Sequence, residues 1–363
     1  MNRSKLPLAA LVLLLAGCEG ISGNENSGNV QAPVPIPPTP TPTPTPTATA
    51  TPAPVGLSLT GNTALAHDPT ILKDGNTYYL FTTGNLPDSE GLLAMRTSTD
   101  LTDWTLRGAS YTAIPAWAKA AIPDVPGMWA PDIVKRNGEY RLYYSVSSFG
   151  RNNSGIGLAT NTALNTNTPS AGWTDKGAVI RSATTDNFNA IDPAVFTDAD
   201  GREWMAFGSF WTGIKMVQLD PATGLRLASD TTLHSLASRP FPGAVEAPYI
   251  VRHGDFYYLF VSFDTCCQGA NSTYNTVVGR SRNPVGPYLD KAGRSMLDGG
   301  GSAVLASAQG TGARYVGRGH VAILQEPGGD HIVYHAYDTQ RNGAPTLQIQ
   351  RLDWDADGWP VAR

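Results

Sequence analysis

Four acidic residues and one histidine stand at or near the starts of five similar segments of the chain, and we call them the head residues. Such side chains can exchange protons with a substrate. They are Asp68, Asp132, Asp192, Glu246 and His320, which lie 64, 60, 54 and 74 residues apart. Carboxylates gathered in one concave site raise one another's pKa values. The alternative is that each Asp-Pro dipeptide only caps a turn, but four acidic copies at one position of a repeat favour a shared site.

The five segments share one order of residues. Each has a carboxylate or His beside Pro or Gly, a short apolar run, a turn with Gly and an aromatic-rich run, which predicts a strand, a hairpin and a second strand. The segments are HDPTILKDGNTYYLFTT from His67, APDIVKRNGEYRLYYSV from Ala130, IDPAVFTDADGREWMAFGS from Ile191, EAPYIVRHGDFYYLFVS from Glu246 and GHVAILQEPGGDHIVYHAY from Gly319. The hairpin signals, in which Gly tolerates positive φ, are Asp74-Gly75, Asn137-Gly138, Asp200-Gly201, His253-Gly254 and Gly328-Gly329.

The spacing of these segments leaves room for two further strands in each unit. Four strands per unit form the blade of a β-propeller, so the sequence predicts an all-β, five-bladed β-propeller. The first strand of each blade lines the central channel in such a fold. We therefore expect the five head residues to converge at one end of the channel.

Composition restricts the partners of the chain. Its 363 residues carry a net charge of -4, so no surplus of Lys or Arg is present to neutralise phosphates, and a nucleic-acid partner is not expected. No G-x-S-x-G, P-loop or dinucleotide fingerprint occurs, which leaves serine hydrolases and nucleotide enzymes without support. A neutral or solid substrate fits the composition better.

The N-terminal region is expected to address and tether the protein. Residues 1–17 carry two basic residues and then an apolar run too short to cross a bilayer, as in a secretory signal peptide. The ending Leu-Ala-Gly-Cys resembles the bacterial lipoprotein cleavage box, which implies lipidation of Cys18, and Glu19 favours sorting to the outer membrane; the alternative is an ordinary signal peptide with a stray cysteine. Residues 18–56 form a Pro/Thr-rich linker with little to bury, and the propeller is expected to occupy residues 57–363.

The segments HDPTIL, WAPDI, NAIDPAVF, SFW, VEAPYI and GRGH resemble glycoside hydrolase family 43, most closely its endo-α-1,5-L-arabinanases. The resemblance covers the whole domain, with the motifs in the order of the family. It implies a five-bladed propeller and an inverting glycosidase, in agreement with the count of repeats.

The resemblance implies a role for each of three carboxyl groups. Asp68 matches the general base, Glu246 the general acid, and Asp192 the carboxylate that raises the pKa of the acid and holds it in place. An inverting glycosidase needs one protonated carboxyl group at the leaving oxygen and one ionised carboxylate that holds water on the opposite face of the sugar. Two carboxyl groups in unlike environments can meet both needs at one pH.

Other motif residues match segments that contact the sugar in the family. Polar groups there pair with hydroxyls, while aromatic rings cover the apolar face of a sugar. We expect stacking from Trp129 and Trp211, for which core packing is the alternative. The expected substrate-binding residues are Gly150, Asn189, Ala190, Ile191, Asp192, Ser209, Phe210, Trp211 and Trp129.

His320 matches a family histidine that contacts a metal, usually calcium, near the active site. The resemblance therefore implies one calcium ion, whose remaining ligands must be water, because calcium prefers six to eight oxygen ligands; a structural histidine is the alternative.

Cys266 and Cys267 are adjacent, and an oxidising compartment permits a strained disulfide between them. The sequence leaves open whether they are bonded or are two thiols.

Three functions are consistent with these residues. The first is an endo-acting, inverting arabinanase, a monomer held to the outer membrane only by its lipid, whose substrate is the polysaccharide arabinan. The second is an exo-acting α-L-arabinofuranosidase or β-xylosidase of the same family. The SFW and CCQG segments, and the end of the chain at Arg363 without a further domain, favour the endo mode. The third, a propeller that only binds glycans, would not need a proton donor at Glu246.

Overall fold

The computed structural model describes residues 56–86, 90–122 and 124–363. The predicted signal peptide, the predicted lipidation site Cys18 and nearly all of the predicted linker lie outside these residues. Within the described part of the chain, no helix is long and apolar enough to cross a membrane.

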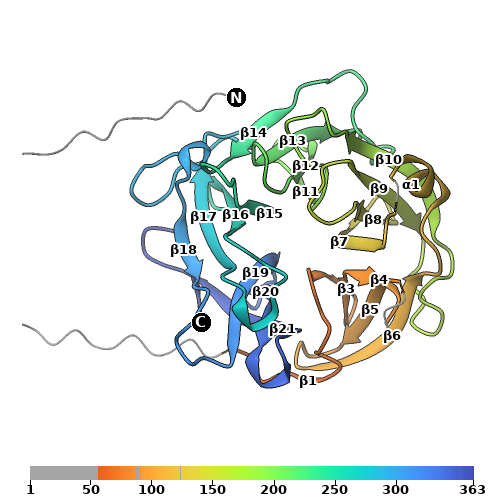
Figure 1. The fold of residues 1–363 in the computed structure, drawn as a ribbon, viewed down its shortest axis with the longest axis horizontal. Coiled ribbons are helices and arrows are strands. Elements are labelled where there is room, and N and C mark those ends of the chain that lie inside the picture. The colour runs from red at the N-terminus through yellow and green to blue at the C-terminus, as the bar shows by residue number, and fades with distance from the viewer. Residues whose placement is uncertain (1–55, 87–89, 123) are drawn as a thin grey trace, which may run out of the picture. The chain divides into compact units, whose positions relative to one another are not determined.

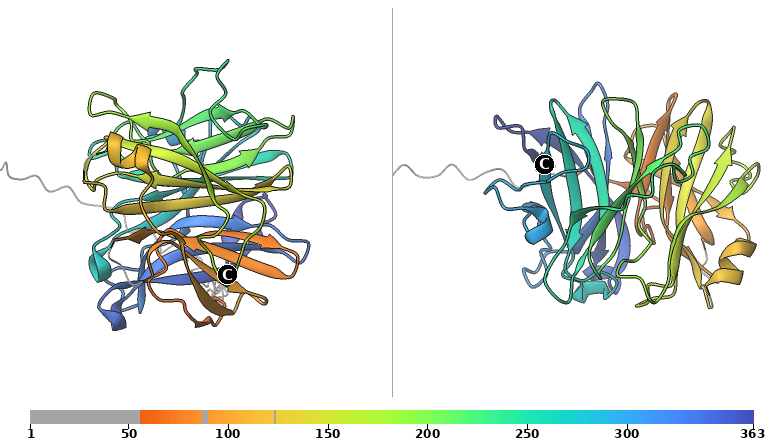
Figure 2. Two further views of the ribbon diagram at one scale, coloured as in Figure 1. Left: turned by 90° about the vertical axis from the view of Figure 1, so that its right-hand side faces the viewer. Right: turned by 90° about the horizontal axis from the view of Figure 1, so that it is seen from above.

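Five sheets stand in a ring, antiparallel except for one parallel strand pair in the first sheet, and the fold is the all-β, five-bladed β-propeller that the repeats predict (Figure 1). Seen from above in Figure 2, the blades stand side by side. Blade 1 consists of β1 (Thr60–Gly61), β2 (Thr70–Asp74), β3 (Thr77–Thr82), β5 (Leu92–Ser98) and β6 (Asp103–Tyr111). Blade 2 consists of β4 (Gly84–Asn85), β7 (Gly127–Arg136), β8 (Glu139–Val146), β9 (Ser154–Asn161) and β10 (Thr174–Ser182).

Each of the other three blades has four strands in chain order. Blade 3 consists of β11 (Ala194–Thr197), β12 (Glu203–Phe207), β13 (Ile214–Leu219) and β14 (His234–Ala237), and blade 4 of β15 (Val245–His253), β16 (Phe256–Phe263), β17 (Asn275–Ser281) and β18 (Ser302–Leu305). Blade 5 consists of β19 (Tyr315–Leu324), β20 (Asp330–Asp338), β21 (Ala344–Trp354) and β22 (Pro360–Ala362). The helical turns of the described residues are α1 (Ala116–Ala121), η1 (Gly269–Asn271), η2 (Met296–Asp298) and η3 (Thr339–Arg341).

All five predicted hairpins are present, each between the first and second strand of the repeat. In the hairpin that joins β7 to β8, Arg136 pairs with Glu139. Asn137 and Gly138 form the turn with φ values of 51° and 78°, the left-handed backbone of a two-residue hairpin.

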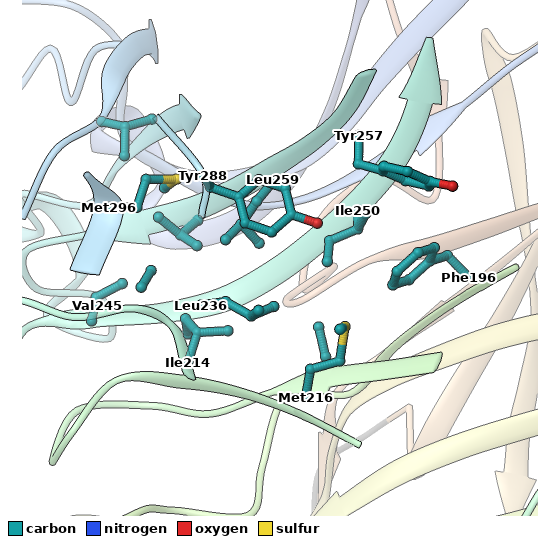
Figure 3. Packing of buried hydrophobic residues seen from close by; sticks show 14 of the residues in the cluster. Phe196, Ile214, Met216, Leu236, Val245, Ile250, Tyr257, Leu259, Tyr288 and Met296 are labelled. Atoms are coloured by element: carbon teal, nitrogen blue, oxygen red, sulfur yellow. The ribbon is translucent and has the colours of Figure 1, made fainter. Parts of the chain in front are cut away.

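Hydrophobic clusters lie between the blades. Each of the five clusters joins residues of two neighbouring sheets, so that every blade is buried on both faces. Figure 3 shows the cluster between blades 3 and 4, where Phe196 and Met216 face Ile250 and Leu259. The cluster between blades 5 and 1 closes the ring, and the amide of Leu57 bonds to the carbonyl of Ile349 at 2.8 Å in the same region.

One residue in left-handed backbone lies just before or within the innermost strand of each blade. These residues are Asp68, Ala130, Asp192, Ala247 and His320, with φ values of 50°, 42°, 61°, 52° and 52°. The predicted alignment of the five head residues is therefore wrong in two blades. Asp132 lies two residues after the shared position, and Glu246 lies one residue before it.

In four of the five blades, a side chain at or near the end of the second strand supports this arrangement. Thr83, Ser145 and Ser262 accept the amide hydrogen of Ala130, Asp192 and His320 in the next blade, at 2.8, 2.9 and 2.9 Å. His335 of blade 5 likewise accepts the amide hydrogen of Asp68 at its Nδ1, at 3.1 Å. These bonds hold the first strands of blades 1, 2, 3 and 5 where they enter the channel.

Candidate active site

Asp68, Asp192 and His320 occupy the shared left-handed position of their blades and Glu246 precedes it by one residue, so that the four lie at the same end of the propeller. All four are largely buried, with Asp68, Asp192 and Glu246 exposing 9%, 7% and 8% of their surface. Each of them alters the pKa of others in the set. The structure therefore brings together three carboxyl groups and one imidazole.

Both oxygens of Asp68 accept hydrogen bonds. Oδ2 bonds to Nδ1 of His67 at 2.8 Å and to the hydroxyl of Thr83 at 2.5 Å, while Oδ1 lies 3.0 Å from Nδ1 of His320. Burial alone would raise the pKa of Asp68, but the two histidine rings hold it well below its ordinary value. The group is thus an ionised carboxylate. Because a carboxylate offers about four lone pairs, Oδ1 still has one for a water molecule.

Glu246 lies in a different environment. Its Oε2 accepts a hydrogen bond from the hydroxyl of Ser209 at 2.6 Å. Burial raises the pKa of Glu246 above its ordinary value, although the hydroxyls of Ser209 and Tyr274 act against that rise. The site therefore contains one carboxyl group that keeps its proton more readily than usual and one, Asp68, that loses it more readily.

Asp192 interacts electrostatically with both Asp68 and Glu246. Its Oδ2 accepts the amide hydrogen of Ala247, the residue after Glu246, at 3.2 Å. Burial raises the pKa of Asp192 well above its ordinary value, His320 opposes this, and the charges of Glu246 and Asp68 add to it. Because burial and mutual repulsion disfavour two negative charges on Asp192 and Glu246, the pair retains a proton to a higher pH than an exposed carboxyl group would.

His320 has one ring nitrogen that could hold a metal ion. Its Nδ1 faces Asp68, and no described residue bonds to its Nε2. An imidazole whose other nitrogen is held by a carboxylate is the usual form of a metal-binding histidine, so the residue fits as the one protein ligand of a hydrated cation. Burial would lower the pKa of His320, but the carboxyl groups of Asp68, Asp192 and Glu246 raise it to about 9, so a cation bound at Nε2 would have to displace a proton from that nitrogen.

Asp132 does not belong to this group, contrary to the prediction that all five head residues converge. It is buried within the channel, where Oδ1 accepts a hydrogen bond from the hydroxyl of Thr70 at 3.0 Å and Oδ2 one from the amide of Val195 at 2.7 Å. Thr70 belongs to β2 and Val195 to β11, so Asp132 joins the first strands of three blades. Its role here is structural.

The predicted sugar-contacting residues lie in two kinds of surroundings. Trp211 is 40% exposed, Phe210 and Ile191 are half-buried, and Gly150 is exposed with open space around it. Trp129 is half-buried, belongs to none of the hydrophobic clusters among the described residues and donates to Asn85 at 2.7 Å. These residues are available to a ligand.

The segment from Asn189 to Ile191 is less open than the sequence suggests. Asn189 is 3% exposed, and its side-chain oxygen bonds to no described group. Ala190 is fully buried in the cluster between blades 2 and 3, so its side chain packs in the core and does not face the site. Its amide is held by the hydroxyl of Ser182 at 2.9 Å.

Several residues of the site carried no motif that sequence reasoning could use. Thr83 directly follows β3, and His335 and Tyr337 lie in β20 of the last blade. These residues come close to Asp68 only when the ring of blades is closed. Tyr274 packs beside Glu246 and stacks on His335, with ring centroids 5.8 Å apart. Phe149 is 78% exposed beside Gly150. Its position next to that glycine was the one feature of the sequence that could have indicated a role in the site.

Cys266 and Cys267 are joined by a disulfide bond. This settles the alternative that the sequence left open. The backbone amide of Cys267 donates to the hydroxyl of Tyr337 at 2.7 Å, which places the disulfide close to the residues around Asp68.

Comparison with known proteins identifies related sequences and structures. The family model described as glycosyl hydrolases family 43 matches residues 62–360. The extracellular endo-α-(1→5)-L-arabinanase 1 of Bacillus subtilis is 46% identical over 298 residues, 82% of this chain and 87% of the relative. The extracellular exo-α-(1→5)-L-arabinofuranosidase ArbA of Cellvibrio japonicus is 43% identical over 307 residues, 81% of this chain and 85% of the relative.

A solved structure shares the architecture as well. The α-L-arabinanase of Cellvibrio cellulosa complexed with arabinohexaose matches with a TM-score of 0.76 and 39% identity, covering 86% of this chain and 96% of that one.

Proposed function

The chain belongs to glycosyl hydrolases family 43, and from that premise we propose that it is an endo-acting, inverting arabinanase that cleaves α-1,5-L-arabinofuranosidic bonds within arabinan. The observation that carries the proposal is the opposite environment of two carboxyl groups at one end of the channel. Asp68 is held ionised by His67 and His320, whereas burial favours the protonated form of Glu246.

The roles of the residues follow from these environments. Glu246, as general acid, donates its proton to the leaving glycosidic oxygen. Asp68, as general base, takes a proton from a water molecule that attacks the anomeric carbon from the opposite face, so that the configuration inverts. Asp192 raises the pKa of Glu246 through its charge and fixes the backbone beside it by accepting the amide hydrogen of Ala247.

His320 would hold one calcium ion through Nε2, with water as the remaining ligands. A cation there supplies positive charge that stabilises the ionised forms of nearby carboxyl groups. Independently of any ion, the chain's own His320 orients the Asp68 carboxylate through the 3.0 Å contact at Nδ1.

The mode of cleavage is tested by a time course of products from linear α-1,5-arabinan. A ladder of intermediate oligosaccharides before free arabinose is the expected result. Monomer or one fixed short product from the start would support the second candidate, an exo-acting enzyme, which the 43% identity to the exo-acting relative favours.

We also propose that Cys18 is lipidated and tethers the protein, as a monomer, to the outer membrane, with residues 18–56 as a spacer. The sequence of residues 1–18 supports this, and the test is incorporation of labelled palmitate into the full chain but not into its Cys18→Ser variant.

A further inference from the structure

Hydrogen bonds lead from the Asp68 carboxylate to the Cys266–Cys267 disulfide through two intervening side chains. Nδ1 of His67 bonds to Oδ2 of Asp68 at 2.8 Å, and Nε2 of the same ring bonds to the hydroxyl of Tyr337 at 2.8 Å. That hydroxyl accepts the amide hydrogen of Cys267 at 2.7 Å. Three blades contribute: His67 precedes β2, Tyr337 lies in β20, and the cysteines follow β16.

The donors and acceptors of this chain are compatible with an arrangement in which every hydrogen bond points toward Asp68. The amide of Cys267 can only donate, and the ionised carboxylate of Asp68 can only accept. In this arrangement the hydroxyl of Tyr337 donates to Nε2 of His67, and Nδ1 of His67 donates to Asp68. Because every bond points the same way, each one fixes the orientation of the next group.

The surrounding packing leaves the His67 ring little freedom. It stacks on the ring of His335 with centroids 4.0 Å apart and an angle of 22° between the planes. Tyr337 is 2% exposed, and its ring packs edge-on against His335, with centroids 5.2 Å apart. Movement of the hydroxyl of Tyr337 would thus be passed to His67, and from His67 to Asp68.

We propose that His67 and Tyr337 are positioning residues for the Asp68 carboxylate, and that the Cys266–Cys267 disulfide holds the outer end of this chain in place. The inference rests on the proposed role of Asp68 as general base. The disulfide closes a ring around the peptide bond between the two cysteines, and this peptide carries the amide that bonds to Tyr337. Opening the ring frees that amide to turn away, so the proposal makes the activity sensitive to a dithiol reductant.

Reduction gives a direct way to release the outer end. A dithiol such as dithiothreitol supplies two electrons and two protons, the S–S bond becomes two thiols, and the reagent closes to its own cyclic disulfide. The purified enzyme is assayed on linear α-1,5-arabinan, oxidised and reduced, as wild type and as Tyr337→Phe. Phenylalanine keeps the ring packing but cannot bond to either neighbour.

We expect reduction and Tyr337→Phe each to lower kcat by about tenfold or more with KM unchanged, since small misplacements of a catalytic group have large effects on rate. Reduction should cause no further loss in Tyr337→Phe, because the connection is already broken. Tyr334→Phe is the matched control, because it removes a hydroxyl from the same strand that bonds to no described residue; it should keep the wild-type activity and the sensitivity to reductant.

Three results would overturn the proposal. The losses of kcat from reduction and from Tyr337→Phe could multiply when the two are combined, KM could rise in place of the fall in kcat, or neither reduction nor Tyr337→Phe could have an effect. A Cys266→Ser/Cys267→Ser double variant repeats the test without reductant. A wild-type enzyme that releases no product from arabinan contradicts the proposed function instead. The positioning chain is then judged by the 15N signals of the His67 imidazole, assigned with His67→Asn. Signals that move on reduction in wild type but not in Tyr337→Phe support it, and signals that stay unchanged in wild type refute it.

Discussion

The hydroxyl of Ser209 donates to Oε2 of Glu246 at 2.6 Å, whereas the hydroxyls at the equivalent position of three other blades accept an amide from the next blade. Thr83 also donates to a carboxylate of the site, Oδ2 of Asp68 at 2.5 Å, but Ser209 is the one hydroxyl of this repeated position, among the described residues, that bonds to the proposed acid. The same structural position supports the backbone in three blades and tunes an acid in a fourth.

Ser209→Ala should move the alkaline limb of the pH profile of kcat/KM to higher pH. A hydrogen bond to the ionised form stabilises that form and lowers the pKa of Glu246. Without the bond the pKa rises, and the acid keeps its proton to a higher pH. A pH-rate profile on arabino-oligosaccharides measures the shift, and a limb that stays in place would show that Ser209 does not tune the acid.

Asp192→Asn should move the same limb in the opposite direction and lower the rate. The negative charges of Asp192 and Glu246 repel one another, so an amide in place of the Asp192 carboxylate removes this repulsion and lowers the pKa of the acid. The acid then loses its proton at a lower pH. A variant with the wild-type profile would refute the tuning role.

Glu246→Ala and Asp68→Ala should each lower hydrolysis of arabinan by about 10²- to 10⁴-fold, the range for loss of a general acid or base. Binding of the polymer and the cooperative unfolding transition should persist. Asp255→Ala, which removes an exposed carboxylate in the hairpin at the other end of β15, serves as the control. Activity in either site variant near that of the control would mean that the chemistry lies elsewhere.

Sequence reasoning predicted the five hairpins because glycine turns and alternating apolar residues are local signals. It misaligned Asp132 and Glu246 because the shared position is defined by left-handed backbone, and in those blades alanine occupies it. In these two blades we aligned the nearby acidic residue, Asp132 or Glu246, in place of Ala130 or Ala247. The sequence did not predict that four further residues surround Asp68, because only closure of the ring brings their strands together. They are His67, Tyr274, His335 and Tyr337.

Asp132→Ala should destabilise the fold by about 2 kcal/mol, because it leaves the amide of Val195 and the hydroxyl of Thr70 buried without their acceptor. Burial raises the pKa of Asp132 from 3.8 to about 6. A raised acid pKa favours the folded state at low pH, and this contribution is lost as the pH rises from about 4 through about 6. The gap between wild type and variant in denaturant unfolding should therefore be wider at pH 4 than at pH 7, and an equal gap would contradict the assignment.

Removal of divalent cations should lower the melting temperature of the wild-type domain, and calcium should restore it. A ligand that binds only the folded state stabilises it by about 2.7 kcal/mol at 100 times its Kd. His320→Ala should lose this response, because it lacks the one protein ligand; activity is not the readout, since the change also removes the contact with Asp68. His253→Ala, which alters a histidine stacked on Trp354 at the far end of β15, should keep the response. If dialysis against a strong chelator changes neither the melting temperature nor the activity of the wild type, His320 is a structural partner of Asp68 and holds no metal.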